Sequence, residues 1–360
     1  MSPLKKELGY STKYFGGDLG GLGVTLFFVL SGFLITYLLF TEKRESKDIH
    51  VKKFIIRRIL RIWPAYFLAV VIGFFIFPGL DKATGDFMQD HFWLKLGLFI
   101  AFLANFVRAI IFDAGVVNHL WSVCVEEQFY LTWPFILKKF SDRFLKIAFI
   151  IIAGNILLRV IPSVWNIYHP LSESNKIVWM ICDITSKFFS WFRVDCMALG
   201  GIGAYLLINN KAKSLKVIYN PWVQIASYIF ILIFMAFEIS FSFFTHEVYA
   251  LLFLVVILNV SSNPNSLVNL ENRLMNELGK ISYGLYLYHP FVYFLLLFFY
   301  HKGIGMTTLP LGNLVLIYSL TIIGTTAFSW LSYYLFESYF LQMKKKFTII
   351  QSGDDARKQA

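Results

Sequence analysis

The densest group of polar residues in an apolar setting is the run His-Leu-Trp-Ser-Val-Cys-Val-Glu-Glu-Gln-Phe-Tyr, from His119 to Tyr130. In a helix, Ser122, Glu126 and Tyr130 share one face because they lie four residues apart. Glu127 then points about 100° away from Glu126. One carboxylate can therefore serve acid/base chemistry or bind a substrate hydroxyl, while the other pairs with an arginine. A buried ion pair that only orders a helix bundle is the alternative.

Three arginines follow a helical spacing at Arg57, Arg58 and Arg61. Residues three and four apart are neighbours on a helix, so we expect these guanidinium groups to gather at one helix start. Arginine is suited to bidentate phosphate binding. The motif thus fits a nucleotide-bearing acyl donor such as acyl-CoA. An ordinary cytoplasmic anchor or a contact with lipid headgroups is the competing interpretation.

Two further segments carry candidate substrate-binding and catalytic groups. Arg193 and Asp195 stand in the run Phe-Arg-Val-Asp, where they can pair across the entrance of a cleft. His289 lies inside an apolar run together with Ser282 and Tyr286. Histidine is a natural proton shuttle near neutral pH. A lone histidine in such a run can equally be a hydrogen-bonded structural residue.

The composition indicates a membrane protein. Of the 360 residues, 57% are hydrophobic and only 15% are charged, and the mean hydropathy is +0.62. Soluble domains carry about 25% charged residues. The net charge of +11 comes from short basic clusters between apolar runs, which excludes a nucleic-acid partner and marks cytoplasmic loops instead. No motif for a metal or a bound cofactor occurs.

The pattern predicts an all-α, polytopic transmembrane helix bundle. Loop 79–92 is acidic and should lie outside, whereas 138–146 is basic and should lie inside. Two apolar runs separate these loops, so one of the two does not make a full crossing. We expect about nine crossings plus one or two re-entrant or interfacial segments, including 177–192. Gly200, Gly201 and Gly203 would allow close helix packing. The candidate runs, each judged against the ~20 residues that a crossing needs, are 22–40, 61–78, 93–112, 119–137, 143–162, 193–209, 222–241, 246–261, 281–300 and 311–336.

Three parts of the chain follow from this pattern. Residues 1–21 form an N-terminal lead, residues 22–343 the transmembrane domain, and residues 344–360 a basic tail. The tail starts with three lysines, which predicts a cytoplasmic C-terminus for a multi-pass protein of the inner (cytoplasmic) membrane.

Five motifs in this order resemble those of the acyltransferase 3 family of integral-membrane O-acyltransferases. The resemblance implies a ten-helix membrane domain that moves an acyl group, commonly acetyl, from cytoplasmic acyl-CoA to a hydroxyl of a carbohydrate or glycolipid. It also implies that the arginine motif lies on the donor side. The motifs are Gly-Val-Thr-Leu-Phe-Phe-Val-Leu-Ser-Gly-Phe-Leu-Ile-Thr from Gly23, the three arginines, His-Leu-Trp-Ser-x-x-Val-Glu-Glu-Gln-Phe-Tyr from His119, Phe-Arg-Val-Asp from Phe192, and Ile-Ser-Tyr-Gly-Leu-Tyr-Leu-Tyr-His-Pro from Ile281.

Two departures from the family pattern affect the expected chemistry. Residues 1–21 hold no helix with the family's catalytic histidine, so either Met1 is a false start or the base is missing or replaced by His119 or His289. Thr25 also stands where the family has an aspartate. A glycan or small-molecule transporter or flippase, and an inactive, N-terminally truncated member of the family, are the alternatives to an acyltransferase.

Overall fold

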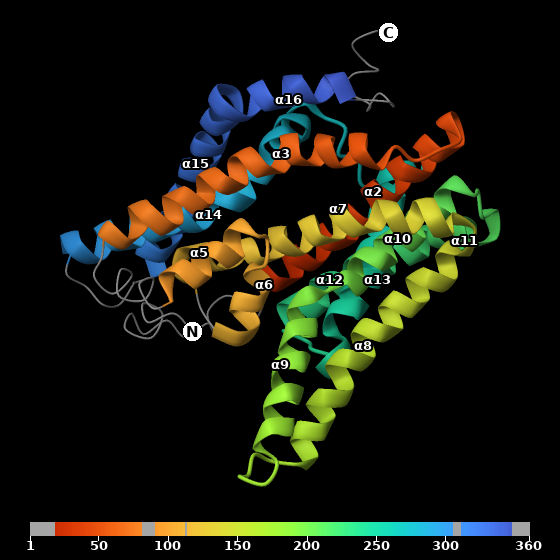
Figure 1. Ribbon diagram of the computed structural model, residues 1–360. Coiled ribbons are helices and arrows are strands. Elements are labelled where there is room, and N and C mark those ends of the chain that lie inside the picture. Colours follow the sequence, from red (N-terminus) through yellow and green to blue (C-terminus); the bar gives the residue numbers. More distant parts are fainter. Residues whose placement is uncertain (1–18, 81–90, 112–113, 305–310, 348–360) are drawn as a thin grey trace. The chain divides into compact units, whose positions relative to one another are not determined.

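The computed structural model describes residues 19–80, 91–111, 114–304 and 311–347. Helices make up the ordered elements of these ranges, and no strand occurs in them (Figure 1). The predicted all-α class is therefore confirmed. Most of the predicted N-terminal lead, of loop 79–92 and of the basic tail lies outside the described residues.

The first of two compact units takes its described part from Lys52–Cys124 and Glu271–Thr348. Two long helices that follow one another in the sequence, α14 and α15, pack together in it. The helices of this unit are α3 (Val51–Val71), η2 (Ile72–Ile76), η3 (Phe77–Gly79), α5 (Phe92–Ile100), α6 (Ala104–Phe106), η4 (Val107–Ile111), η5 (Gly115–Leu120), α14 (Arg273–Ile304), α15 (Leu311–Ser332), η8 (Tyr333–Glu337), α16 (Ser338–Lys344) and η9 (Lys345–Phe347).

The second unit takes its described part from the end of the N-terminal region up to Val51 and from Val125–Leu270. Helix α7 begins in the first unit and continues in the second. Helix α10 lies against α2, α8 and α13, so it forms the centre of this unit. The helices here are α2 (Leu19–Ser46), α7 (Trp121–Phe140), η6 (Ser141–Arg143), α8 (Phe144–Tyr168), α9 (Lys176–Phe192), α10 (Val194–Ile208), α11 (Ala212–Ile218), α12 (Pro221–Ala236), η7 (Ser242–Phe244) and α13 (Thr245–Ser262).

Glycines bring α2 and α10 into backbone contact. A Cβ atom placed on Gly32 would lie 1.9 Å from the carbonyl oxygen of Met197, and one placed on Gly200 would lie 2.0 Å from that of Val29. A Cβ atom placed on Gly203 would lie 2.4 Å from Cδ1 of Leu254. The packing role predicted for the glycines of α10 is confirmed, because no larger residue fits at this crossing.

Seven stretches of the described chain are long and apolar enough to cross a membrane, or eight if a bent pair of helices counts as one crossing. One of these stretches, Gly115–Tyr168, contains both α7 and α8. Another, Lys176–Ile208, joins the predicted interfacial segment 177–192 to α10. The multi-pass architecture is confirmed, whereas the number of nine crossings stays a prediction.

The apolar run 93–112 does not form one crossing helix. Helix α5 has nine residues, which rise about 14 Å, less than half of the ~30 Å hydrocarbon core. The chain then turns at Phe102, whose φ of 56° is left-handed, before α6 and η4. This break agrees with the charge pattern, which requires one of the two runs between loops 79–92 and 138–146 to fall short of a full crossing.

A buried hydrogen bond ties α7 to α2 inside the second unit. The Trp133 indole Nε1–H donates to Thr36 Oγ1 at 2.8 Å, and both side chains are buried. We expect Thr36→Val to lower the free energy of unfolding by about 1–3 kcal/mol, because the indole N–H stays buried without an acceptor. Detergent-based unfolding measures this. The exposed Thr132→Val on α7 should change stability by no more than about 0.5 kcal/mol, and equal effects would contradict the assignment.

Candidate functional site

His119 is fixed through both of its ring nitrogens. It lies in η5, where Nδ1 contacts the Val116 carbonyl oxygen at 3.1 Å and Nε2 contacts that of Leu287 at 3.0 Å. Carbonyl oxygens only accept hydrogen bonds, so they compete for the single proton of a neutral ring. The contact with Leu287 links η5 to α14. In this arrangement neither ring nitrogen of His119 is open to a substrate.

Ser122 and Tyr286 complete a polar cluster around His119 in the first unit. The Tyr286 hydroxyl donates to the His119 carbonyl oxygen at 2.9 Å and lies 2.5 Å from Ser122 Oγ. The ring of His289 is 5.7 Å from that of His119 and 5.8 Å from that of Tyr286. The structure thus brings together candidate residues of two separate motifs: His119 and Ser122 from one, and Tyr286 and His289 from the other.

Pro290 explains how His289 is oriented. Proline has no N–H, so the helix leaves the Tyr286 carbonyl oxygen, four residues earlier, without its usual donor. His289 Nδ1 lies 2.8 Å from this oxygen and 3.3 Å from the Leu285 oxygen. Because both partners only accept, Nδ1 carries the proton of the neutral ring and Nε2 carries the lone pair. Ser282, also a candidate, is exposed and donates to Gly279 O at 2.9 Å.

Two of the three arginines of the motif gather as the spacing predicted. The guanidinium groups of Arg57 and Arg58 lie over the same Phe54 ring, 5.9 and 5.3 Å from its centre, and Arg57 also donates to the Phe347 carbonyl oxygen at 2.8 Å. Arg61 instead lines a separate pocket.

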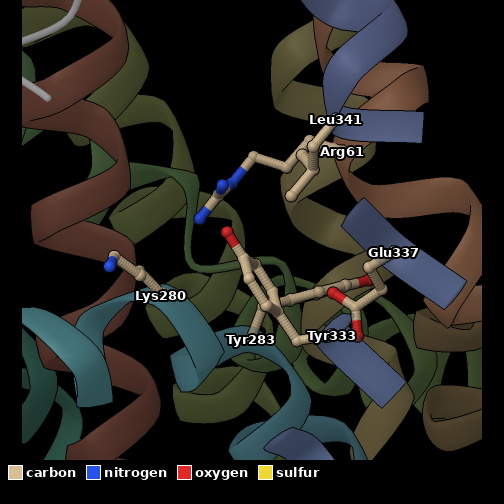
Figure 2. A pocket seen from close by; sticks show the side chains of 6 residues that line it. All are labelled: Arg61, Lys280, Tyr283, Tyr333, Glu337 and Leu341. Carbon is tan, nitrogen blue, oxygen red and sulfur yellow. The ribbon is translucent and has the colours of Figure 1, made fainter. Parts of the chain in front are cut away.

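Arg61 lines a small, tightly packed pocket in the first unit (Figure 2). Side chains from the middle of α3, the first half of α14, η8 and α16 line it. Lys280 supplies a second positive charge and also pairs with Glu277 at 2.7 Å. Glu337 is the one carboxylate of the lining and accepts a hydrogen bond from Ser332 at 2.9 Å. The lining residues are Arg61, Lys280, Tyr283, Tyr333, Glu337 and Leu341.

Glu126 is held by two hydroxyl groups in the second unit. Ser31 Oγ and the Tyr130 hydroxyl, the latter at 3.0 Å, both donate to Glu126 Oε1. The predicted shared face of Glu126 and Tyr130 on α7 is confirmed by this contact. Glu127, on the neighbouring face, is 1% exposed. Both carboxylates are therefore buried, which is costly without a compensating role.

Arg193 and Asp195 do not form the expected pair. Arg193 donates from Nε to the Ser190 carbonyl oxygen and from Nη1 to that of Gly21, both at 3.1 Å. Neither oxygen of Asp195 receives a hydrogen bond from a donor. The reason lies in the backbone: Arg193 precedes α10 with a φ of 28°, so its side chain leaves in another direction than that of Asp195.

The second unit contains a buried ion pair whose residues belong to none of the sequence motifs. Arg159 of α8 donates to Glu247 of α13, and both are buried. Asp195 is close enough to Glu247 to interact with it electrostatically. Arg159 is a single charged residue in an apolar run, and Glu247 is the only carboxylate of its run, so an ionisable residue inside a predicted crossing was the available signal. Their partners belong to other helices, and the sequence does not identify them.

A family profile for an acyltransferase domain matches residues 6–334 of this chain. This range includes the arginine motif, the segment from His119 to Tyr130, and His289. No solved structure matches the chain significantly.

Several bacterial proteins are similar in sequence. The peptidoglycan O-acetyltransferase OatA of Listeria monocytogenes is 31% identical over 167 residues, which are 44% of this chain and 26% of the relative. A putative O-acetyltransferase of Staphylococcus aureus is 28% identical over 340 residues, 89% of this chain and 52% of the relative. An uncharacterized protein of Haemophilus influenzae is 38% identical over 137 residues, 35% of this chain and 54% of the relative. The chain thus spans about half the length, or less, of these curated relatives.

Proposed function

Because this chain belongs to the acyltransferase family whose profile covers residues 6–334, we propose that it is a membrane O-acyltransferase. The acyl group, which we take to be acetyl, moves from acyl-CoA to a hydroxyl of a carbohydrate or glycolipid. The names of the relatives in Listeria and Staphylococcus support acetyl as the group, and the name of the Listeria protein, a peptidoglycan O-acetyltransferase, supports a glycan as the acceptor.

The observation that carries the proposal is the pocket around Arg61. Its lining has two cations, Arg61 and Lys280, against one carboxylate, Glu337. Two tyrosines, Tyr283 and Tyr333, add hydroxyl groups. The Tyr283 hydroxyl donates to the Ile62 carbonyl oxygen at 3.1 Å, so Arg61, Lys280 and Tyr333 are the donors for phosphate oxygens. A guanidinium group forms strong, charge-assisted hydrogen bonds to them. We propose that this pocket binds the phosphate groups of acyl-CoA. Arg57 and Arg58 are proposed to attract the same phosphates as acyl-CoA approaches the pocket.

We propose catalytic roles for Glu126 and Glu127 in the second unit and for His289 and His119 in the first unit, each within its own unit. Glu126 is preorganised by its two hydroxyl donors, which suits a group that binds or polarises a substrate hydroxyl. Of the two histidines, His289 has the nitrogen that its carbonyl contacts leave available.

Charge supports a donor site on the cytoplasmic side. Arg61 lies in α3 shortly after the basic segment 41–58, and Glu337 lies two turns of helix before Lys344. Both basic segments mark cytoplasmic ends under the positive-inside rule. The proposed location is the cytoplasmic membrane with the C-terminus inside, where acyl-CoA is made available.

The test is transfer of radiolabelled acetyl from acetyl-CoA to the host's envelope glycans by the full chain in lipid nanodiscs. We expect Arg61→Ala to raise the KM for acetyl-CoA by about 10- to 100-fold, since a hydrogen bond to a charged group contributes about 1.5–3 kcal/mol. Arg273→Ala removes an exposed arginine at the start of α14 and should leave KM unchanged. Equal KM values in the two variants would contradict the donor site.

A further inference from the structure

Three lysines gather at one end of the second unit. Lys213 and Lys216 lie on the short helix α11, and Lys211 directly precedes this helix. All three residues are exposed, whereas Leu215 of the same helix is buried. Residues three positions apart are neighbours on a helix. Helix α11 therefore packs its leucine against the unit and presents its charges on the outside.

The three lysines have no acidic partner. The chain contains no Asp or Glu from residue 196 to residue 237 or from 248 to 270. These stretches contain all of α11 and α12 and most of α10 and α13. Within the ranges that the structure describes, the three lysines form no ion pair. This end of the unit thus carries uncompensated positive charge, which attracts an anionic partner.

Hydrogen bonds from buried amides hold the segment that carries the lysines. Asn259 Nδ2 of α13 donates to the Ile218 carbonyl oxygen at 3.0 Å. The Tyr219 carbonyl oxygen accepts from Asn263 Nδ2 at 3.4 Å and from Gln224 Nε2 at 3.1 Å. Asn259 and Gln224 are both buried. A segment that is already ordered loses less conformational freedom when it binds, so the fixed α11 favours a ligand that meets the lysines together.

The lysines lie at the same end of the unit as the basic end of α2. Gly200 of α10 lies against Val29 of α2. Farther along both helices, the ring of Tyr205 lies 5.9 Å from that of Phe40, so α10 runs in the same direction as α2. The end of α10, which leads into α11, therefore lies near the last turn of α2 with its Lys43. Basic ends of this kind face the cytoplasm.

Large apolar side chains accompany the lysines. Val217 of α11 is exposed, and Trp222, the second residue of α12, is 77% exposed. Leu267, whose backbone N–H donates to Gln224 Oε1 at 3.1 Å, is exposed as well. Helix α11 meets α12 at a bend of 54°, so it does not continue the axis of that helix. Tryptophan collects at the boundary between lipid headgroups and acyl chains, and basic residues beside apolar ones are typical of a segment in this boundary.

We propose that α11 and Lys211 form a binding surface for the headgroups of anionic phospholipids. The lipid phosphate accepts hydrogen bonds from the three lysine ammonium groups, while Val217 and Trp222 contact the upper part of the acyl chains. The apolar residues favour a lipid over a soluble anion, because a soluble phosphate compound has nothing to cover them. This role does not depend on acyl transfer.

The experiment uses the full chain in liposomes of equal parts phosphatidylglycerol and phosphatidylcholine. One of the two lipids carries a photoactivatable group in each preparation, and mass spectrometry quantifies the cross-links to residues 209–222. We expect Lys213→Gln/Lys216→Gln to lower the ratio of phosphatidylglycerol to phosphatidylcholine cross-links about 25-fold, since each lysine near an anionic surface contributes about a factor of five. Lys213→Arg/Lys216→Arg keeps both charges and should keep the ratio.

Lys176→Gln/Lys187→Gln is the matched control, because it removes two lysines of α9 that pair with Glu173 and Asp183. It should leave the ratio at residues 209–222 unchanged. Equal labelling by both lipids in the wild type, or a ratio that persists in Lys213→Gln/Lys216→Gln, overturns the inference. Loss of the phosphatidylglycerol cross-links when soluble CoA is added would assign the lysines to a soluble phosphate compound and overturn it as well.

Discussion

Arg159→Met is expected to lower the free energy of unfolding by about 3–5 kcal/mol, as for breaking a buried ion pair. Arg159 is 4% exposed and Glu247 is 7% exposed. Without the guanidinium, Glu247 keeps Asp195 as its acidic neighbour, so two buried carboxyl groups stay close together without their guanidinium partner. Titration of the full chain with sodium dodecyl sulfate in mixed micelles measures the change.

The partner substitutions make this prediction specific. Glu247→Gln should cost less than Arg159→Met, because Arg159 still has Asp195 nearby. The double variant Arg159→Met/Glu247→Gln should recover part of the loss, since it removes one of the two facing carboxylates. Glu173→Gln breaks an exposed pair with Lys176 and should cost no more than about 1 kcal/mol. A cost for Arg159→Met as small as that control would contradict the account.

Gly200→Ala is expected to destabilise the second unit by about 3 kcal/mol, the upper end of the range for overpacking. The added Cβ would lie 2.0 Å from Val29 O and 2.8 Å from the Phe33 nitrogen. Both are backbone atoms of α2, so no side-chain rotation relieves the clash and the helices must separate. The same titration measures this effect. Gly32→Ala should act similarly, and the double variant should cost less than the sum because both substitutions open one interface.

Gly154→Ala is the matched control on α8. A Cβ there meets no atom within 4 Å, and alanine is a better helix former than glycine by up to about 1 kcal/mol. This variant should therefore be neutral or slightly more stable. A Gly200→Ala protein as stable as Gly154→Ala would show that the two helices do not pack as closely as described.

Local periodicity made part of the site predictable. Glu126 and Tyr130 are four residues apart, and α7 places them on one face as this spacing requires. The family motifs also named His119, Ser122, Tyr286 and His289, which the structure brings together in the first unit. In these cases the two residues either share one helix, whose period fixes their spacing, or belong to motifs that occur together in the family.

Contacts between distant helices were not predictable from spacing. His246 meets Thr25 across 221 residues, and Arg159 meets Glu247 across 88. Each contact joins residues of two different helices, and helix packing alone selects the partner. The expected pairing of Arg193 with Asp195 failed for a related reason, because closeness in sequence does not fix side-chain direction where a helix begins.

Composition predicted the class of fold better than its topology. High hydropathy and basic clusters indicated a multi-pass helical protein, which the seven or eight candidate spans of the described residues confirm. Hydropathy does not show where an apolar run breaks, as 93–112 does at Phe102. The backbone conformation at individual residues determines where such a helix ends.

The most direct test of the central claim is acyl transfer by the purified full chain alone. The protein would be reconstituted in liposomes, with acetyl-CoA on one side and isolated envelope glycan available to it. The account predicts ester-linked acetyl on the glycan and an equal amount of free CoA thiol. Glycan that crosses the bilayer unmodified, with no thiol released, would contradict it and identify a transporter instead.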